Sequence, residues 1–94
     1  MHKKREDIVH MVSEAVEKRY RESPFSIPGQ DVTPSTALRE ELEFDSLTLV
    51  VLQIEIEDLF HIRFNPATED LRTVFQTVQT LSDGIQRHLE EVGE

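Results

Sequence analysis

Apolar side chains recur at steps of three and four residues along three stretches of this chain, and no other feature restricts the fold as strongly. The stretches cover about residues 3–20, 45–60 and 74–91. That spacing places the apolar side chains on one face of an α-helix, whereas the sustained two-residue alternation of a half-buried strand is lacking. The sequence therefore predicts an all-α protein with three long helices.

Prolines interrupt this pattern. Pro24 must end the first helix, because proline has no amide hydrogen to donate and its ring clashes with the preceding turn. The connection that follows, about residues 22–45, is unusually long for a compact domain unless it is anchored. We expect a short helical turn begun near Ser35 or Thr36, and apolar anchors at Phe25, Ile27, Val32, Leu38 and Leu42.

Asn65-Pro66 breaks the chain again. We expect a brief turn over residues 68–72 and a last helix over about 74–91, with Thr73 and Gln76 at the spacing of a capping box. Three long helices and a short one then form an antiparallel four-helix bundle. With 94 residues there is room for one core of useful size, so we expect a single domain over 1–94, ordered over about 3–91.

The charge of the chain is strongly negative, with 19 acidic and 10 basic side chains and a net charge of −9. Nucleic acid would be repelled by such a surface, so we expect no nucleic-acid partner. The lack of cysteine excludes disulfides and cysteine-based zinc sites. No apolar run approaches the roughly 20 residues that span a bilayer. We expect a cytoplasmic monomer without stable membrane insertion.

Asp45, Ser46 and Leu47 open the second helix. Asp and Ser are both good N-cap residues, because their side-chain oxygens accept hydrogen bonds from amides of the first turn. A hydroxyl here also lies beside unpaired amides at the positive end of the helix dipole, where a phosphate ester would be stabilised. Spacing alone favours the simpler interpretation, in which Ser46 only caps the helix, and leaves the phosphate site as the alternative.

The second helix carries two apolar stripes, one more than packing on a single side needs. The inner stripe, which we expect in the core, consists of Leu49, Leu52, Ile56 and Phe60. The outer stripe, turned away from it, consists of Leu47, Val50, Val51 and Ile54.

Motifs for metal binding or catalysis are lacking. The four histidines, at positions 2, 10, 61 and 88, show no metal-ligand spacing, and no calcium-binding loop pattern occurs. A hydrolytic triad built on Ser46 would lack the Gly-x-Ser-x-Gly elbow. We therefore expect no metal and no catalytic residue.

The run TALREELEFDSL, from Thr36 to Leu47, resembles the prosthetic-group attachment segment of the acyl carrier protein family. That segment has a leucine, a short acidic stretch and then Asp-Ser-Leu at the start of the second helix. The continuation EDLFHI over residues 57–62 is also similar. The resemblance extends from about Ile8 to Leu89 and implies a four-helix bundle of the acyl-carrier type.

The resemblance implies a carrier that catalyses nothing itself. Ser46 would be the covalent attachment site of 4′-phosphopantetheine, which a phosphopantetheinyl transferase takes from coenzyme A. Asp45 would help that enzyme to position its metal ion, and Leu47 would complete the cofactor-binding segment. The thiol of the arm would hold acyl groups as thioesters for fatty-acid, polyketide or specialised lipid biosynthesis. Further partners would be acyl-loading, synthase and acyltransferase enzymes.

In that family the second helix presents the surface that partner enzymes contact. Here this surface would combine the outer stripe with the acids Glu55, Glu57 and Asp58. Three residues depart from the family. Glu43 stands where a glycine is usual, and glycine would permit a left-handed backbone there. Thr48 and Val51 stand where acids are common, which implies a more apolar contact and a specialised carrier with dedicated partners.

Two other functions remain open. The first is an aminoacyl or peptidyl carrier of the same fold, although Asp45 favours the acyl branch, since many peptidyl carriers have histidine before the serine. The second is an unmodified acidic helical module that binds a basic partner through the outer stripe.

Overall fold

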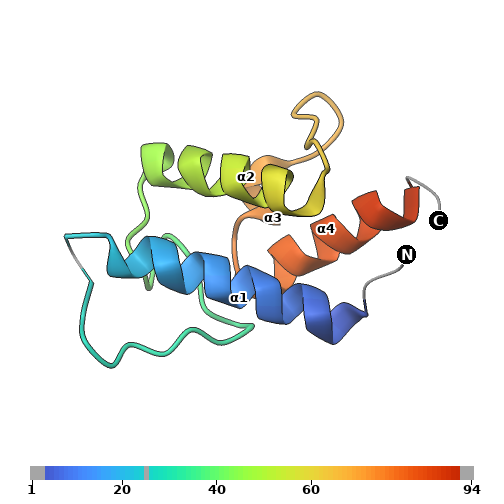
Figure 1. Ribbon diagram of the computed structural model, residues 1–94. Coiled ribbons are helices and arrows are strands. Elements are labelled where there is room, and N and C mark those ends of the chain that lie inside the picture. The colour runs from blue at the N-terminus through green and yellow to red at the C-terminus, as the bar shows by residue number, and fades with distance from the viewer. Residues whose placement is uncertain (1–3, 25, 92–94) are drawn as a thin grey trace.

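The computed structural model describes residues 4–24 and 26–91, and it confirms the all-α prediction. Within these ranges the chain forms four helices and no β-sheet: α1 (Arg5–Arg21), α2 (Ser46–Phe60), α3 (Leu71–Val74) and α4 (Val78–Glu91) (Figure 1). None of these helices combines the length and the hydropathy that crossing a bilayer requires. The expected anchor Phe25 and the expected first residue of α1 lie outside the described residues.

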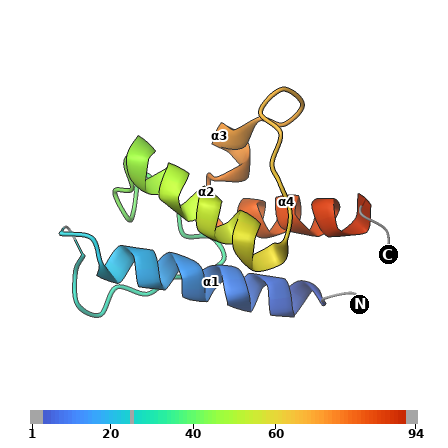
Figure 2. The ribbon, with the colours of Figure 1, turned by 45° about the horizontal axis from the view of Figure 1, so that its top comes forward.

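The other two long helices, α2 and α4, lie beside α1, which runs in the opposite direction to both of them (Figures 1 and 2). α1 packs against α2 and α4, and the short α3 packs against α4. The start of α1 is tied to α4, because Arg5 forms an ion pair with Asp83 and donates a hydrogen bond of 3.0 Å to Gln86. The four-helix bundle expected from the sequence is therefore the observed fold.

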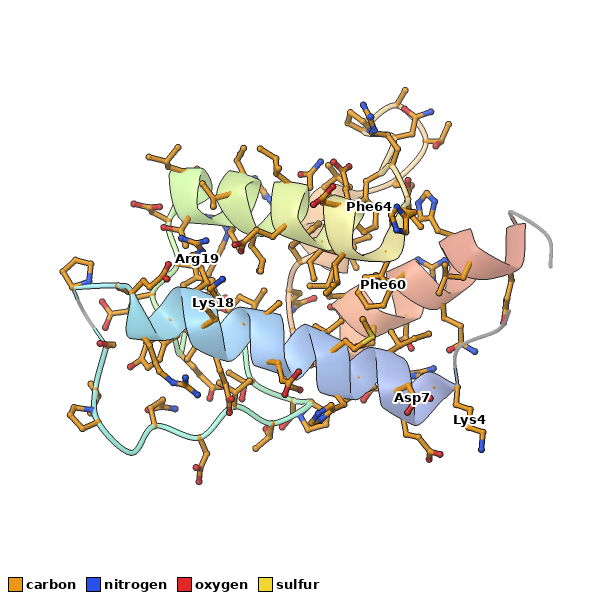
Figure 3. The ribbon with its side chains drawn as sticks, in the orientation of Figure 1. Lys4, Asp7, Lys18, Arg19, Phe60 and Phe64 are labelled. Atoms are coloured by element: carbon orange, nitrogen blue, oxygen red, sulfur yellow. The ribbon has the colours of Figure 1, made fainter. Side chains whose placement is uncertain are left out.

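One core lies between the helices, and the predicted stripes supply it. Phe60 points from α2 into the space between the three long helices (Figure 3). Burial of such apolar surface is the main favourable contribution to folding. The long helices contribute Ile8, Val12, Val16 and Tyr20 from α1, the inner stripe Leu49, Leu52, Ile56 and Phe60 from α2, and Val78, Leu81 and Ile85 from α4. The connections and α3 add Leu38, Leu42, Phe44, Ile62, Phe64, Val74 and Phe75.

The long connection between α1 and α2 passes along α1 and is tied to the start of α4 (Figure 1). The N–H of Leu38 donates to the carbonyl of Gln76 at 3.0 Å. In return, the N–H of Gln79 donates to the carbonyl of Pro34 at 2.8 Å. These bonds satisfy backbone groups on both segments, and they fix where the chain re-enters the bundle before α2.

Most expected anchors of this connection are confirmed. Leu38 and Leu42 are fully buried, and Val32 is half-buried against the core. The expected helical turn is present as one hydrogen bond of 3.0 Å from the N–H of Glu41 to the carbonyl of Ala37. The turn is not extended into a helix, since the chain turns away at residue 43.

Ile27 contradicts the prediction. Its side chain is 60% exposed, so it does not anchor the connection. The backbone does so instead, because the N–H of Ile27 donates a hydrogen bond of 2.8 Å to the hydroxyl of Tyr20, whose ring is buried.

The expected start of the last helix was also wrong. α4 begins at Val78, and Val74 ends α3. Thr77 and Thr80 form the capping box, since each hydroxyl oxygen accepts from the N–H of the other residue, at 2.9 and 3.1 Å. Thr73, the expected cap, lies in α3, where its hydroxyl donates to Asp70 at 2.9 Å. Asp70 is the N-cap of α3, so the expected turn is partly a short helix.

Candidate functional site

Asp45, and not Ser46, is the N-cap of α2. Its backbone is extended, with φ −88° and ψ −179°, and its Oδ1 accepts a hydrogen bond of 2.8 Å from the N–H of Thr48. The hydrogen bonds from the backbone and then the side chain of Thr48 hold the pKa of Asp45 below its ordinary value. Asp45 is therefore a carboxylate at neutral pH, and the interpretation of Ser46 as the cap was wrong.

Ser46 is the first residue of α2 and is exposed. Its hydroxyl makes no hydrogen bond within the described part of the chain, and neither do the N–H groups of Ser46 and Leu47. A free hydroxyl thus lies beside two free amides at the positive end of a 15-residue helix. This arrangement fits a phosphate ester on the serine oxygen, because the amides face the place that an anion would take.

The segment before the cap is held by an unusual backbone and a buried ring. Glu43 has φ +58°, in the left-handed region where glycine was noted as the usual residue. Phe44 follows it and is buried against the ring of Tyr20, with 6.5 Å between the ring centroids. Its N–H donates to the carbonyl of Leu38 at 3.1 Å. The turn at Glu43 therefore places Phe44 in the core and Asp45 and Ser46 at the surface.

The outer stripe of α2 is largely open to solvent. Leu47, Val50 and Ile54 are 72%, 50% and 59% exposed, while Val51 is half-buried at the edge of the stripe. Leu47 and Ile54 are seven residues apart, two helical turns, with Val50 between them, so the three side chains lie on one face that begins beside Ser46.

The three acids expected on the same surface line one hollow of it together with Ile54, but two of them also bond to other parts of the chain. Glu55 accepts a hydrogen bond of 2.7 Å from Arg19 of α1, and this bond, more than the neighbouring charges, raises the pKa of Arg19 above its ordinary value. Arg19 lies on α1 beside Lys18 (Figure 3). Glu57 accepts from the N–H of Phe64 at 2.9 Å. Only Asp58 is fully at the surface. Two of the three carboxylates are therefore half-buried and bonded to other segments of the chain.

A groove of about 220 Å³ lies between α2 and α3, next to Ser46. Leu49, Leu71 and Phe75 give it apolar walls, and Arg39 and Arg72 line it with positive charge. Sequence reasoning missed these two arginines, because no spacing signals that residues so far apart in the chain will lie beside one serine.

Histidines contribute nothing to this site. His88 lies on α4, where its Nε2 is 2.8 Å from Glu69 and its ring stacks edge-on against Phe64. His61 ends α2 in a left-handed conformation, with φ +56°. Within residues 4–24 and 26–91, no three histidine or acidic side chains are grouped as a metal site; His2 lies outside these residues.

Comparison with known proteins identifies the family. Residues 25–85 match the family described as the phosphopantetheine attachment site. The acyl carrier protein of Rubrobacter xylanophilus is 33% identical over 75 residues, which are 79% of this chain and 86% of that protein. No solved structure matches the chain significantly. The family match and this identity over most of both chains show that the chain belongs to the acyl carrier protein family, whose non-catalytic members carry a covalently attached 4′-phosphopantetheine group.

Proposed function

We propose that Ser46 is the attachment point of the 4′-phosphopantetheine arm and that the protein carries acyl groups in fatty-acid, polyketide or specialised lipid biosynthesis. When bound, the arm supplies a terminal thiol that holds the acyl group as a thioester. The observation that carries this proposal is the exposed, unbonded hydroxyl of Ser46 beside two open amides at the start of α2.

The residues around Ser46 have separate roles in this proposal. Asp45 fixes the first turn of α2 through its bond to Thr48, and its exposed carboxylate is accessible to the metal ion of a transferase. Glu43 and Phe44 hold the segment so that the serine faces outward. The protein supplies position and charge, and the partner enzymes supply the chemistry.

The outer stripe supports a mainly apolar contact with partner enzymes. Leu47, Val50 and Ile54 form an exposed apolar face beside Ser46, and Glu55 and Glu57 make contacts within the bundle. We propose that the transferase and the acyl-loading, synthase and acyltransferase enzymes bind here, with Val51 and Asp58 at the edges. A single core supports one carrier domain over 1–94. The monomeric state and the cytoplasmic location stay predictions.

The test is direct modification. The purified protein is incubated with coenzyme A and a broad-specificity phosphopantetheinyl transferase, and intact mass is measured. We expect a gain of one arm in the native chain and none in Ser46→Ala. Ser35→Ala, which changes another exposed serine, is the matched control and should be modified like the native chain.

Other outcomes separate the alternatives. A gain that persists in Ser46→Ala would overturn the assignment of the site. No gain in the native chain would instead favour the unmodified module that binds through the outer stripe. Loading of the modified protein by adenylation enzymes rather than by acyl-transfer enzymes would favour an aminoacyl or peptidyl carrier.

A further inference from the structure

The arginines of the chain fall into two groups. Those of the first group pair with carboxylates: Arg5 with Asp83, Arg19 with Glu22 and Glu55, and Arg21 with Glu17. Those of the second group make no side-chain hydrogen bond or ion pair within the described ranges: Arg39, Arg63, Arg72 and Arg87. The chain has 19 acids for 10 basic residues, so a shortage of carboxylates does not explain the second group.

Two of the unpaired arginines line the groove beside Ser46. Arg39 comes from the turn before α2, and Arg72 comes from α3, on the other side of the groove. Arg39 also lies near enough to Asp45 for its charge to contribute to the lowered pKa of that carboxyl, after the hydrogen bonds from Thr48. Arg72 likewise helps to lower the pKa of Asp70, after the hydrogen bonds from Thr73 and Arg72. The fold thus brings two guanidinium groups without an ion pair to the groove beside the serine, within a chain that is acidic overall.

We propose that Arg39 and Arg72 bind the phosphodiester of the arm on Ser46 and so hold the first part of the arm over the groove between α2 and α3. This inference rests on the proposed function. A guanidinium group presents parallel N–H donors that match two oxygens of a phosphate, and such charge-assisted bonds are about twice as strong as neutral ones.

The rest of the groove suits the same ligand. The open amides of Ser46 and Leu47 add donors on the side of α2. The walls made by Leu49, Leu71 and Phe75 are apolar, and they suit the dimethyl-substituted carbon that follows the phosphate in the arm. Positive charge therefore lies at the attachment point, and apolar surface lies next to it.

The experiment uses the native protein labelled with ¹⁵N, before and after arm attachment. We expect the side-chain Nε–H resonances of Arg39 and Arg72 to shift and their exchange with water to slow once the arm is attached. Arg63 and Arg87 are the internal controls, because they are equally unpaired and line other cavities, and their resonances should stay in place. Ser46→Ala treated in the same way should show no shift at any arginine.

The second readout is the ³¹P resonance of the phosphodiester. In the native protein it should differ from that of a modified peptide of residues 43–49, which lacks both arginines. In Arg39→Gln and Arg72→Gln it should move part of the way to the peptide value, and in the double variant nearly all of the way. Arg63→Gln should leave it unchanged.

Intact mass separates the two possible failures. If the native chain gains no arm, the proposed function fails and this inference falls with it. If the arm is attached but both Nε–H resonances keep their unmodified positions, this inference fails while the proposed function stands. Shifts that appear only when a partner enzyme is added would also overturn it and would assign the two arginines to a carboxylate of the partner.

Discussion

The first turns of α2 and α4 satisfy their backbone amides in opposite ways. Every helix begins with N–H groups that have no partner within the helix. At the start of α4 each of them is paired inside the protein: Thr77 with Thr80 (2.9 Å), Val78 with Thr36 (3.4 Å), Gln79 with Pro34 (2.8 Å) and Thr80 with Thr77 (3.1 Å). At the start of α2 only Thr48 is bonded by the cap, at 2.8 Å, and Ser46 and Leu47 remain open.

This difference separates a structural helix start from a binding one. The start of α4 is partly buried and hydrogen-bonded to the connection before α2. It therefore contributes stability but has no N–H donor left for a ligand. The start of α2 lies at the surface, where water satisfies the open amides at little cost. An anion therefore finds free donors at α2 and none at α4.

Breaking the capping box of α4 should have the largest effect on stability. Thr80→Val removes the hydroxyl that accepts from Thr77 and donates to the carbonyl of Val74 at 3.0 Å. We expect a loss of about 2 kcal/mol in the free energy of unfolding, measured by urea titration, because a cap and a partly buried partner are lost together. Arm attachment at Ser46 should be unchanged.

The matched control for Thr80 is Thr68→Val, at an exposed position outside any helix, which should change stability by about 0.5 kcal/mol or less. If Thr80→Val unfolds at the same urea concentration as the native protein, the capping box does not hold the start of α4, and the contrast between the two helix starts is lost.

Relieving the backbone before α2 should have a smaller effect, of opposite sign. Glu43→Gly removes the cost of a side chain at φ +58°, about 1–2 kcal/mol, and adds about 0.5–1 kcal/mol of chain entropy lost on folding. We expect a net gain of about 0.5–1 kcal/mol in urea titration. Glu40→Gly is the control, because this neighbouring exposed residue has no positive φ and should lose stability instead. Equal losses in both variants would contradict the strain at Glu43.

The smallest effect should appear only in acid. Asp45→Asn keeps the cap, since asparagine caps about as well as aspartate, but it cannot titrate. The lowered pKa of Asp45 means that its contribution is fully present above the unfolded-state pKa and is lost as the pH falls through the folded-state pKa. The melting temperatures of the native protein and the variant should therefore agree at neutral pH. They should diverge as the pH falls, because the melting temperature of the native protein decreases more.

Asp70 gives this pH experiment its reference. Its pKa is lowered by hydrogen bonds from Thr73, so Asp70→Asn should show the same pattern. The start of α4 is capped by threonines, which do not titrate in this range, and Thr80→Val should leave the acid dependence as it is in the native protein. If the melting temperatures of the native protein and Asp45→Asn decrease equally as the pH falls, the carboxylate does not hold the first turn of α2.

Local patterns in the sequence predict much of this molecule. The inner stripe of α2 and the buried residues of α1 follow from helical spacing, because the apolar face of a helix in a small bundle packs into its single core. Residue type limits the cap of α2 to Asp45 or Ser46, and only the structure assigns it to Asp45. The left-handed backbone at Glu43 came only from the resemblance, since glutamate itself gives no sign of it.

The wrong predictions share a physical cause. The local sequence allowed more than one conformation, and contacts between distant segments decided which one forms. Thr73 and Thr77 both precede residues that can close a cap. The N–H groups of Val78 and Gln79 donate to the carbonyls of Thr36 and Pro34, and these bonds place the start of α4 at Val78. A single apolar residue such as Ile27 belongs to no periodic pattern, so the sequence does not indicate whether its side chain points to the core or to solvent. The meeting of Arg39 and Arg72 at Ser46 depends on the packing of α3, which spacing along the chain does not encode.

The bond from the N–H of Leu38 to the carbonyl of Gln76 encloses all of α2 and α3 in one loop of the chain. The donor residue Leu38 and Val78, two residues after the acceptor, are fully buried, so we expect the bond to open only when the bundle does. Amide hydrogen exchange at Leu38 should therefore be as slow as at Val12 in the core, while Ser46 and Leu47, a few residues away, exchange at nearly the rate of a free chain. The attachment segment therefore starts from a point, Leu38, that stays fixed as long as the protein stays folded.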